Sequence, residues 1–201
     1  NLLTNEAGAT INSGASIDTA TLAGNEVLLQ FVTVSAFVLD GYAFVAEKEI
    51  GEAYGARDKH RLYRAMRLTT EIALVSGLMI SVVYYLAGGW LIDTFVRDAD
   101  VKQIALAFLP YCAVVPLIGV PCWQLDGFFL GATRGKALRN AAVITTALYV
   151  ATDLAFRQLF GNTGVWIAFL LMYVYRAFAL GAYLPDLIKT SEKTPSVRGQ
   201  R

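Results

Sequence analysis

Five long apolar stretches dominate this 201-residue chain and limit what it can fold into. A helix needs about twenty apolar residues to cross the hydrocarbon core of a bilayer. Each stretch meets that length, and short polar segments separate one stretch from the next. The sequence therefore predicts an all-α fold, a polytopic membrane helical bundle with five complete spans. These spans cover residues 22–55, 70–96, 104–132, 141–160 and 165–188.

The two ends of the chain differ in character from the spans. Residues 1–12 are too short and too polar to cross a membrane alone, and they resemble the end of a helix whose beginning is missing. We therefore expect residues 1–21 to be the remnant of a truncated membrane helix followed by an external loop. Residues 189–201 are rich in basic and polar residues and are predicted to form a cytoplasmic tail.

Positive charge alternates between the connecting segments and predicts their sidedness. Cytoplasmic loops of membrane proteins carry an excess of Lys and Arg. The connections after the first and third spans and the tail are basic, whereas the other two connections are not. We expect residues 13–21 to lie outside and the C-terminus to lie in the cytoplasm. The basic residues of the two loops are Arg57, Lys59, His60, Arg61, Arg64, Arg67, Arg134, Lys136 and Arg139.

Composition excludes several classes of function. A net charge of +1 provides no basic field for nucleic acid. The single histidine, His60, excludes a histidine metal cluster and a Ser-His-Asp triad within this chain. Cys112 and Cys122 lie ten helical residues apart, about 15 Å along an axis, which is too far for a disulfide. We expect no enzyme, no cofactor and no bound metal.

One polar stripe runs along the first span. Glu26, Gln30, Thr33, Asp40 and Glu47 recur at spacings of three, four and seven, which places them on one face of a helix. Carboxylates inside a span are expensive and usually face a partner or a water-filled path. The stripe therefore indicates either a face that meets water or substrate, or a polar face packed against another helix.

Two Asp-Gly pairs lie inside the spans. Leu39-Asp40-Gly41 is echoed by Leu125-Asp126-Gly127, which puts a second carboxylate in the cytoplasmic half of the bundle. Burial favours the neutral form of a carboxyl group, which suits a proton-coupled step. The alternative is that each aspartate hydrogen-bonds the backbone at a turn loosened by its glycine.

Basic residues within the spans are few. Arg157 lies one turn beyond Asp153, and the spacing favours an i, i+4 ion pair near the outer surface. Arg176 lies near the middle of the fifth span, where we expect it to pair with a carboxylate or with helix carbonyls; direct contact with substrate is the other interpretation.

Local sequence also predicts helix shape and packing. Pro110, Pro116 and Pro121 should bend the third span, because each removes a backbone hydrogen bond. Gly51 and Gly55, four residues apart, allow two helices to approach closely near the cytoplasmic surface.

Two motifs resemble a known family. Phe-Val-Leu-Asp-Gly-Tyr-Ala-Phe-Val-Ala-Glu at residues 37–47, followed by Ile50-Gly51 and by Gly-Ala-Arg-Asp at residues 55–58, is similar to the eighth helix of MATE (multidrug and toxic compound extrusion) transporters of the DinF branch. Leu-Asp-Gly-Phe-Phe-Leu-Gly-Ala-Thr-Arg at residues 125–134, followed by Ala-Leu-Arg-Asn at residues 137–140, is similar to their tenth helix and the loop beyond it.

This resemblance covers nearly the whole chain and implies the C-terminal six-helix lobe of a twelve-helix protein in a bacterial inner membrane. Such transporters export small cationic or amphipathic compounds in exchange for protons or sodium, using two lobes related by an internal repeat. The partner implied is the N-terminal six-helix lobe of the same polypeptide, and this lobe alone should not transport.

The resemblance also bears on the coupling ion. Sodium-coupled relatives place carboxylates on the seventh and tenth helices, where Glu6 and Asp126 lie here. Counted back from Arg134, however, Asp126 does not fall at the position that those relatives use. The resemblance therefore leaves proton and sodium coupling open.

Three other functions compete. A lipid-linked oligosaccharide flippase of the same superfamily usually lines its cavity with several basic residues, and here only Arg157 and Arg176 are candidates. An intramembrane protease needs a Gly-Asp pair or a Ser/His dyad within its spans, but the order here is Asp-Gly and the only histidine lies outside them. A structural membrane subunit without transport activity remains an alternative.

Overall fold

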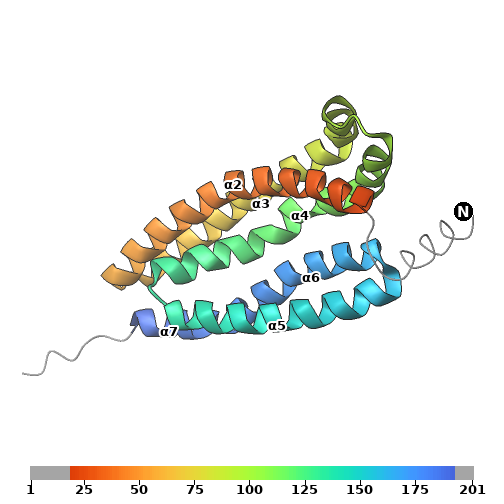
Figure 1. Cartoon of the computed structure of the whole chain (residues 1–201). Helices are drawn as coiled ribbons and strands as arrows, with labels where there is room; N and C mark the ends of the chain where they lie inside the picture. Colours follow the sequence, from red (N-terminus) through yellow and green to blue (C-terminus); the bar gives the residue numbers. More distant parts are fainter. Residues whose placement is uncertain (1–18, 193–201) are drawn as a thin grey trace, which may run out of the picture.

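The computed structural model describes residues 19–192, together with the side chains of residues 19–189, and every element within these residues is an α-helix (Figure 1). Residues 1–18, and with them the expected remnant helix and Glu6, lie outside the described part. The helices are α2 (Thr19–Ala56), α3 (Lys59–Phe95), α4 (Ala99–Gly131), α5 (Gly135–Phe160), α6 (Asn162–Gly181) and α7 (Leu184–Glu192).

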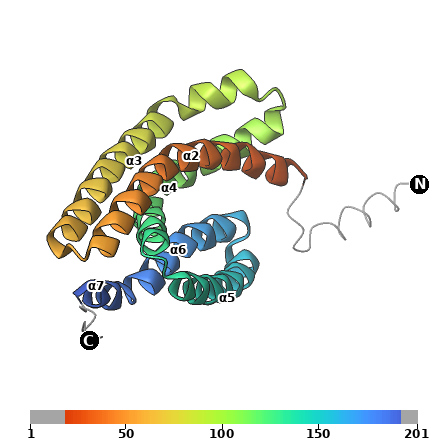
Figure 2. The same ribbon diagram turned by 90° about the vertical axis from the view of Figure 1, so that its left-hand side faces the viewer.

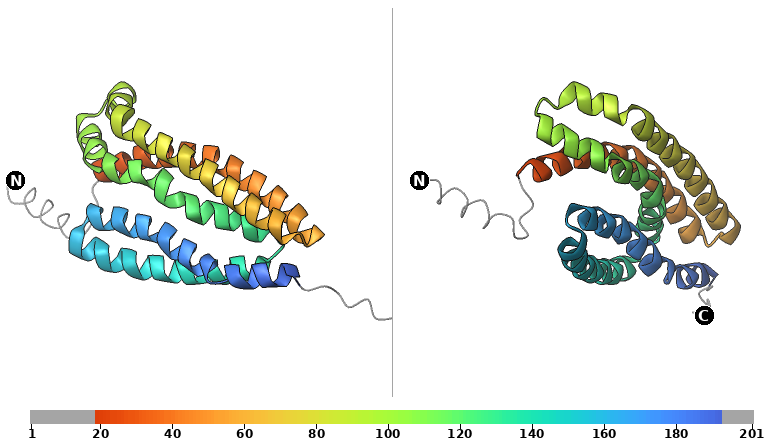
Figure 3. Two further views of the ribbon diagram at one scale, coloured as in Figure 1. Left: turned by 180° about the vertical axis from the view of Figure 1, so that it is seen from behind. Right: turned by 90° about the vertical axis from the view of Figure 1, so that its right-hand side faces the viewer.

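The long helices alternate in direction. In Figure 1, α2, α4 and α6 run one way, while α3 and α5 run the other. One layer consists of α2, α3 and α4, and a second layer of α5 and α6 lies against it, as the views in Figures 2 and 3 also show. Helix α4 contacts α2, α3, α5 and α6 and is the centre of the bundle.

The described residues contain four helical segments that are long and apolar enough to cross a membrane: Thr19–Ala56, Lys59–Phe95, Ala99–Gly131 and Asn162–Lys189. The expected all-α polytopic membrane bundle is therefore confirmed. Helix α5, expected as a span over residues 141–160, has 26 residues and so reaches about 39 Å. It is not among these four segments, and it carries polar residues such as Thr145 and Asp153 along its length.

The helix that contains the predicted second span, residues 70–96, begins before that span, because α3 begins at Lys59. Asp58 caps this helix by accepting a hydrogen bond of 2.9 Å from the backbone N–H of Arg61. The guanidinium of Arg61 also binds Glu49 and Glu52 of α2, and these hydrogen bonds raise the pKa of Arg61. Lys59, His60, Arg61, Arg64 and Arg67 therefore lie on helix α3, and Arg57 alone of these basic residues lies in the turn before it.

The other boundaries also shift. Helix α4 begins at Ala99 rather than at residue 104, and α5 begins at Gly135 rather than at residue 141. The expected four-residue turn between the last two spans is only Gly161, whose φ of +58° favours glycine. The fifth span, expected over 165–188, is split: α6 ends at Gly181 and the separate helix α7 begins at Leu184. The expected tail from residue 189 therefore begins within α7.

Glycines let α2 and α4 approach closely. A Cβ on Gly127 would lie 2.6 Å from the carbonyl oxygen of Ala43, and a Cβ on Gly131 would collide with the carbonyl of Glu47. A Cβ on Gly51 would lie 3.2 Å from the carbonyl oxygen of Gly131. Because α2 and α4 run parallel and touch at these positions, residues 43 and 127 lie at the same height along the bundle axis. This register brings the two Asp-Gly pairs side by side.

The predicted close approach at Gly51 is present, whereas Gly55 faces open space. The three prolines lie inside one continuous helix, α4, which changes direction along its length, as Figure 2 shows. Cys112 and Cys122 are free and buried, as expected.

Candidate functional site

An ion pair joins α4 to α6 within the apolar spans. Asp126 accepts two hydrogen bonds from Arg176, from Nε to Oδ2 at 2.9 Å and from Nη2 to Oδ1 at 2.7 Å. Each side chain is 24% exposed, so the pair is largely enclosed. Two parallel charge-assisted hydrogen bonds of this kind fix the orientation of both groups. Arg176 therefore has the carboxylate partner that its position in the span predicted.

A cavity of about 310 Å³ opens beside this ion pair, between α4, α5 and α6. The hydroxyl of Thr145 is buried and has no hydrogen-bond partner in the described part of the chain. A buried hydroxyl without a partner carries a desolvation cost that a ligand or water in this cavity would remove. The lining residues include Cys122, Trp123, Thr145, Thr146, Met172 and Tyr173.

Asp40 of α2 lies next to this pair. Ala43 touches Gly127 across the seam between α2 and α4, which puts Asp40 within about one helical turn of the level of Asp126. The two carboxylates are close enough for their charges to interact, and the charge of Asp40 also acts on Tyr173 of α6. Asp40 is half-buried and forms no hydrogen bond or ion pair with the described residues.

The idea that each aspartate braces a turn loosened by glycine finds no support in the hydrogen bonds. Helices α2 and α4 continue without a break through Gly41 and Gly127. Asp126 binds the side chain of Arg176 and not the backbone. Gly127 is instead explained by its close contact with α2.

The polar stripe of α2 runs from an exposed part near the start of the helix to the seam with α4. Glu26, Gln30 and Thr33 are exposed, whereas Asp40 and Glu47 are half-buried. The amide of Gln30 donates to Glu26 at 3.0 Å, and the hydroxyl of Thr33 donates to its own helix. The buried side of the same helix is formed by Gly24, Leu28, Val32, Ser35, Leu39, Ala46, Ile50 and Ala53.

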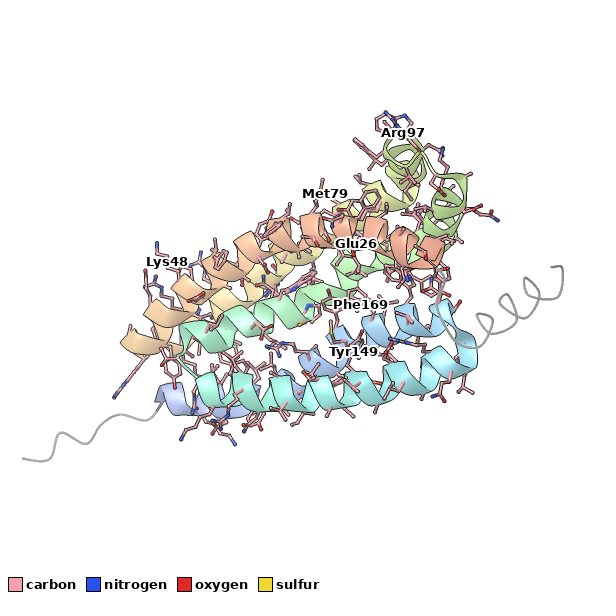
Figure 4. The ribbon with its side chains drawn as sticks, viewed as in Figure 1. Glu26, Lys48, Met79, Arg97, Tyr149 and Phe169 are labelled. Atoms are coloured by element: carbon pink, nitrogen blue, oxygen red, sulfur yellow. The ribbon has the colours of Figure 1, made fainter. Side chains whose placement is uncertain are left out.

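Glu26 contributes to a second cavity, of about 330 Å³, at the other end of the bundle. Figure 4 shows Glu26, Phe169 and Tyr149 on three different helices, α2, α6 and α5, around this space. The cavity also contains Arg157, which forms the expected ion pair with Asp153 at 2.5 Å. Its aromatic walls and paired charges resemble those of the cavity beside Asp126.

The sequence interpretation missed a polar network that ties the start of α2 to the start of α6. Asn25 donates to Asn162 at 2.6 Å and accepts from the indole N–H of Trp166 at 2.9 Å. A signal existed in the sequence, because Asn25 is a polar residue in an apolar helix. Its partners, more than 130 residues away, could not be found from spacing.

No group of three His, Cys, Asp or Glu side chains that could hold a metal ion occurs in the part of the chain that the structure describes. The site contains two carboxylates and one guanidinium on apolar helices, with Asp126 and Arg176 largely enclosed and Asp40 half-buried. Such charges at membrane depth are typical of ion and substrate pathways.

The fold and the site together define a polytopic membrane protein with an enclosed ion pair between its spans. The family model MatE matches residues 10–154. The chain therefore belongs to the MatE family, whose members are transporters rather than enzymes.

Relatives of known name agree with this assignment. The chain is 35% identical over 175 residues to the DNA damage-inducible protein F of Escherichia coli, covering 87% of the chain and 38% of that protein. It is 26% identical over 200 residues to the probable multidrug resistance protein NorM of Agrobacterium fabrum, covering 94% of the chain and 42% of that protein. The chain thus spans about two fifths of these relatives. No solved structure matches the chain with significance.

Proposed function

We propose that this chain is the C-terminal lobe of a cation-coupled multidrug or metabolite efflux antiporter of the MatE family. The relatives and the family match support efflux as the activity, and one of those relatives carries multidrug resistance in its name. The share of each relative that the chain covers fits one lobe of a two-lobed protein. The N-terminal six-helix lobe of the same polypeptide is the required partner, because alternating access needs two lobes that move against each other.

The observation that carries the proposal is the group formed by Asp40, Asp126 and Arg176. Charges enclosed among apolar helices are costly for folding and are retained where ions or substrates pass. Asp40 and Asp126 are proposed to form the polar site of this lobe, with a proton or sodium ion as the coupling ion. The stripe residues Glu26, Gln30 and Thr33, together with Glu47, would line the path from this site to the opposing lobe.

The proposed location is the bacterial inner membrane, with several spans and the C-terminus in the cytoplasm. The basic residues at the start of α3 and between α4 and α5 lie at the same end of the bundle, as Figure 1 lets the reader follow. An excess of positive charge at one end marks the cytoplasmic side.

The flippase alternative is less favoured by the charges of the site. A pyrophosphate group needs free cationic side chains, yet Arg157 and Arg176 are both bound to aspartates. Only a measurement of transport distinguishes the proposed antiporter from a structural subunit without transport activity.

The test is efflux by the full-length protein that contains this chain, produced in a bacterial strain lacking its own multidrug exporters. Ethidium efflux from loaded cells is followed by fluorescence, with a proton gradient or a sodium gradient imposed separately. We expect efflux driven by one of the gradients and none from cells that produce residues 1–201 alone. The proposal fails if the full-length protein is abundant in the membrane and supports no gradient-driven efflux of ethidium or other amphipathic cations.

A further inference from the structure

Three charged side chains from three parallel helices meet at one level of the bundle. Asp40 comes from α2, Asp126 from α4 and Arg176 from α6. Asp126 and Arg176 are in direct contact, and Asp40 interacts electrostatically with Asp126. Arg176 is the only charged residue of α6. The group therefore holds two negative charges and one positive charge.

The neighbouring helices bring no further charge to this level. Helix α3 has no charged residue between Glu71 and Asp93, and α5 has none between Arg139 and Asp153. The group that α3 presents there is the hydroxyl of Ser76, which donates to Tyr42 at 2.9 Å.

The remaining groups near this level are uncharged or more distant. The titratable neighbours of Asp40 and Asp126 are Tyr173 of α6 and Cys122 of α4. On α2 itself, Glu47 lies two turns away from Asp40, about 10 Å along the axis. Among the residues that the structure describes, the charge of the site is therefore set by Asp40, Asp126 and Arg176.

We propose that Arg176 fixes the charge count of this site: it neutralises Asp126 permanently, so that Asp40 carries the one negative charge that a proton or a monocationic ligand can neutralise. This inference rests on the proposed function and deepens it, because it makes Arg176 the residue that determines how many cations the lobe exchanges.

The geometry separates the two aspartates. Both oxygens of Asp126 accept hydrogen bonds from the guanidinium, so a sodium ion or proton there would have to displace two charge-assisted hydrogen bonds. A guanidinium keeps its proton at every physiological pH, which makes this neutralisation independent of pH. Asp40 has no such partner among the described residues. An unpaired carboxylate among apolar helices favours its neutral, protonated form.

With this charge count, we expect the site to exchange one proton for one monocationic ligand. A monocationic ligand that enters the site is balanced by the anionic form of Asp40, which must first release its proton. Binding one monocation therefore releases one proton, with charge conserved. No second cation is needed, because Asp126 is already neutralised.

The experiment measures the protons released per bound tetraphenylphosphonium ion. The full-length protein, purified in detergent and weakly buffered, is titrated with tetraphenylphosphonium in the presence of a pH indicator. Because this readout needs binding and not transport, it can succeed even if the proposed efflux function fails. Four variants are compared with the wild type: Asp126→Asn, Arg176→Gln, the double variant Asp126→Asn/Arg176→Gln, and the control Arg176→Lys. Membrane abundance and elution profile are checked for each.

We expect one proton per ligand from the wild type and from Arg176→Lys, which keeps the positive charge. In Asp126→Asn the freed Arg176 neutralises Asp40, so affinity for tetraphenylphosphonium should fall at least about tenfold, the scale of one charge interaction. Arg176→Gln leaves two unpaired carboxylates. This variant should therefore release more protons per bound ligand, or its binding of tetraphenylphosphonium should become sensitive to sodium. The double variant restores one net negative charge and should recover wild-type affinity and the release of one proton.

Failure of the double variant to recover, with normal abundance and elution, would overturn the inference, because a purely structural ion pair predicts no rescue. An unchanged affinity in Asp126→Asn, an unchanged proton count without sodium sensitivity in Arg176→Gln, or the absence of tetraphenylphosphonium binding by the wild type would overturn it as well.

Discussion

The Cα of Gly127 in α4 lies directly against the backbone carbonyl of Ala43 in α2, so that a Cβ there would stand 2.6 Å from the oxygen. Gly131, one turn further, has the same relationship to Glu47. Small residues at this spacing let membrane helices pack backbone to backbone. This seam fixes the register that places Asp40 beside Asp126.

Replacing Gly127 with alanine should therefore separate α2 from α4. Forcing a methyl group into a packed contact costs about 1–3 kcal/mol, and we expect the full-length protein in detergent to unfold at a lower temperature. Gly55→Ala is the matched control, because Gly55 lies on α2 with nothing within 4 Å of an added Cβ. Equal melting temperatures for the two variants would show that the seam is not a tight contact.

Asn25 should contribute to stability through the network at the end of the bundle where α2 and α6 begin. Asn25→Leu removes the acceptor of the Trp166 indole N–H and the partner of Asn162. Leaving such groups unpaired costs about 1–3 kcal/mol, and a fall in melting temperature measures it. Thr33→Val serves as the control, because Thr33 is exposed and hydrogen-bonds only its own helix. A loss in Thr33→Val as large as that in Asn25→Leu would argue against the network.

The unpaired hydroxyl of Thr145 leads to the opposite expectation for stability. Thr145→Val removes a buried polar group that has no partner among the described residues, so the melting temperature should stay constant or rise. If the adjoining cavity holds a ligand, affinity for tetraphenylphosphonium should change in the same variant. A marked loss of stability would show that this hydroxyl has a partner, such as an ordered water, that the fold depends on.

The proposed topology can be tested with single cysteines. Cys112 and Cys122 are buried, so these two residues add little background to the labelling of an introduced cysteine. His60→Cys, at the basic end, should react with a membrane-impermeant maleimide only after cells are opened. Asp100→Cys, an exposed position at the other end, should react in intact cells. The reverse pattern would invert the proposed orientation.

Hydrophobicity alone predicted the helical bundle, because spans of this length have few other stable arrangements in lipid. The start of α3 was missed because Lys59–Arg67 is polar. A search for apolar segments does not detect helical turns that lie outside the hydrocarbon core. The break before α7 was missed for the opposite reason: residues 182–184 are apolar although the helix ends there.

The site was predictable in part. Spacing alone indicated the pair Asp153–Arg157, because both residues lie on one helix. The position of Arg176 in a span predicted a carboxylate partner, but the choice of Asp126 depends on how α4 packs on α6, which sequence spacing does not encode. The Gly127-x-x-x-Gly131 seam could have been read from the sequence, since its spacing is that of Gly51 and Gly55.

The central claim is that the aspartates of this lobe couple ion movement to efflux. The most direct measurement is gradient-driven ethidium efflux by the full-length protein carrying Asp40→Asn or Asp126→Asn, each at normal membrane abundance. Asparagine has nearly the same shape as aspartate but cannot ionise, so it removes the charge; at position 126 its amide NH2 also replaces one of the two oxygens that accept hydrogen bonds from Arg176. We predict that each variant loses gradient-driven efflux while its melting temperature shows that it remains folded. Undiminished efflux in both variants would contradict the account and leave Asp40 and Asp126 as structural residues only.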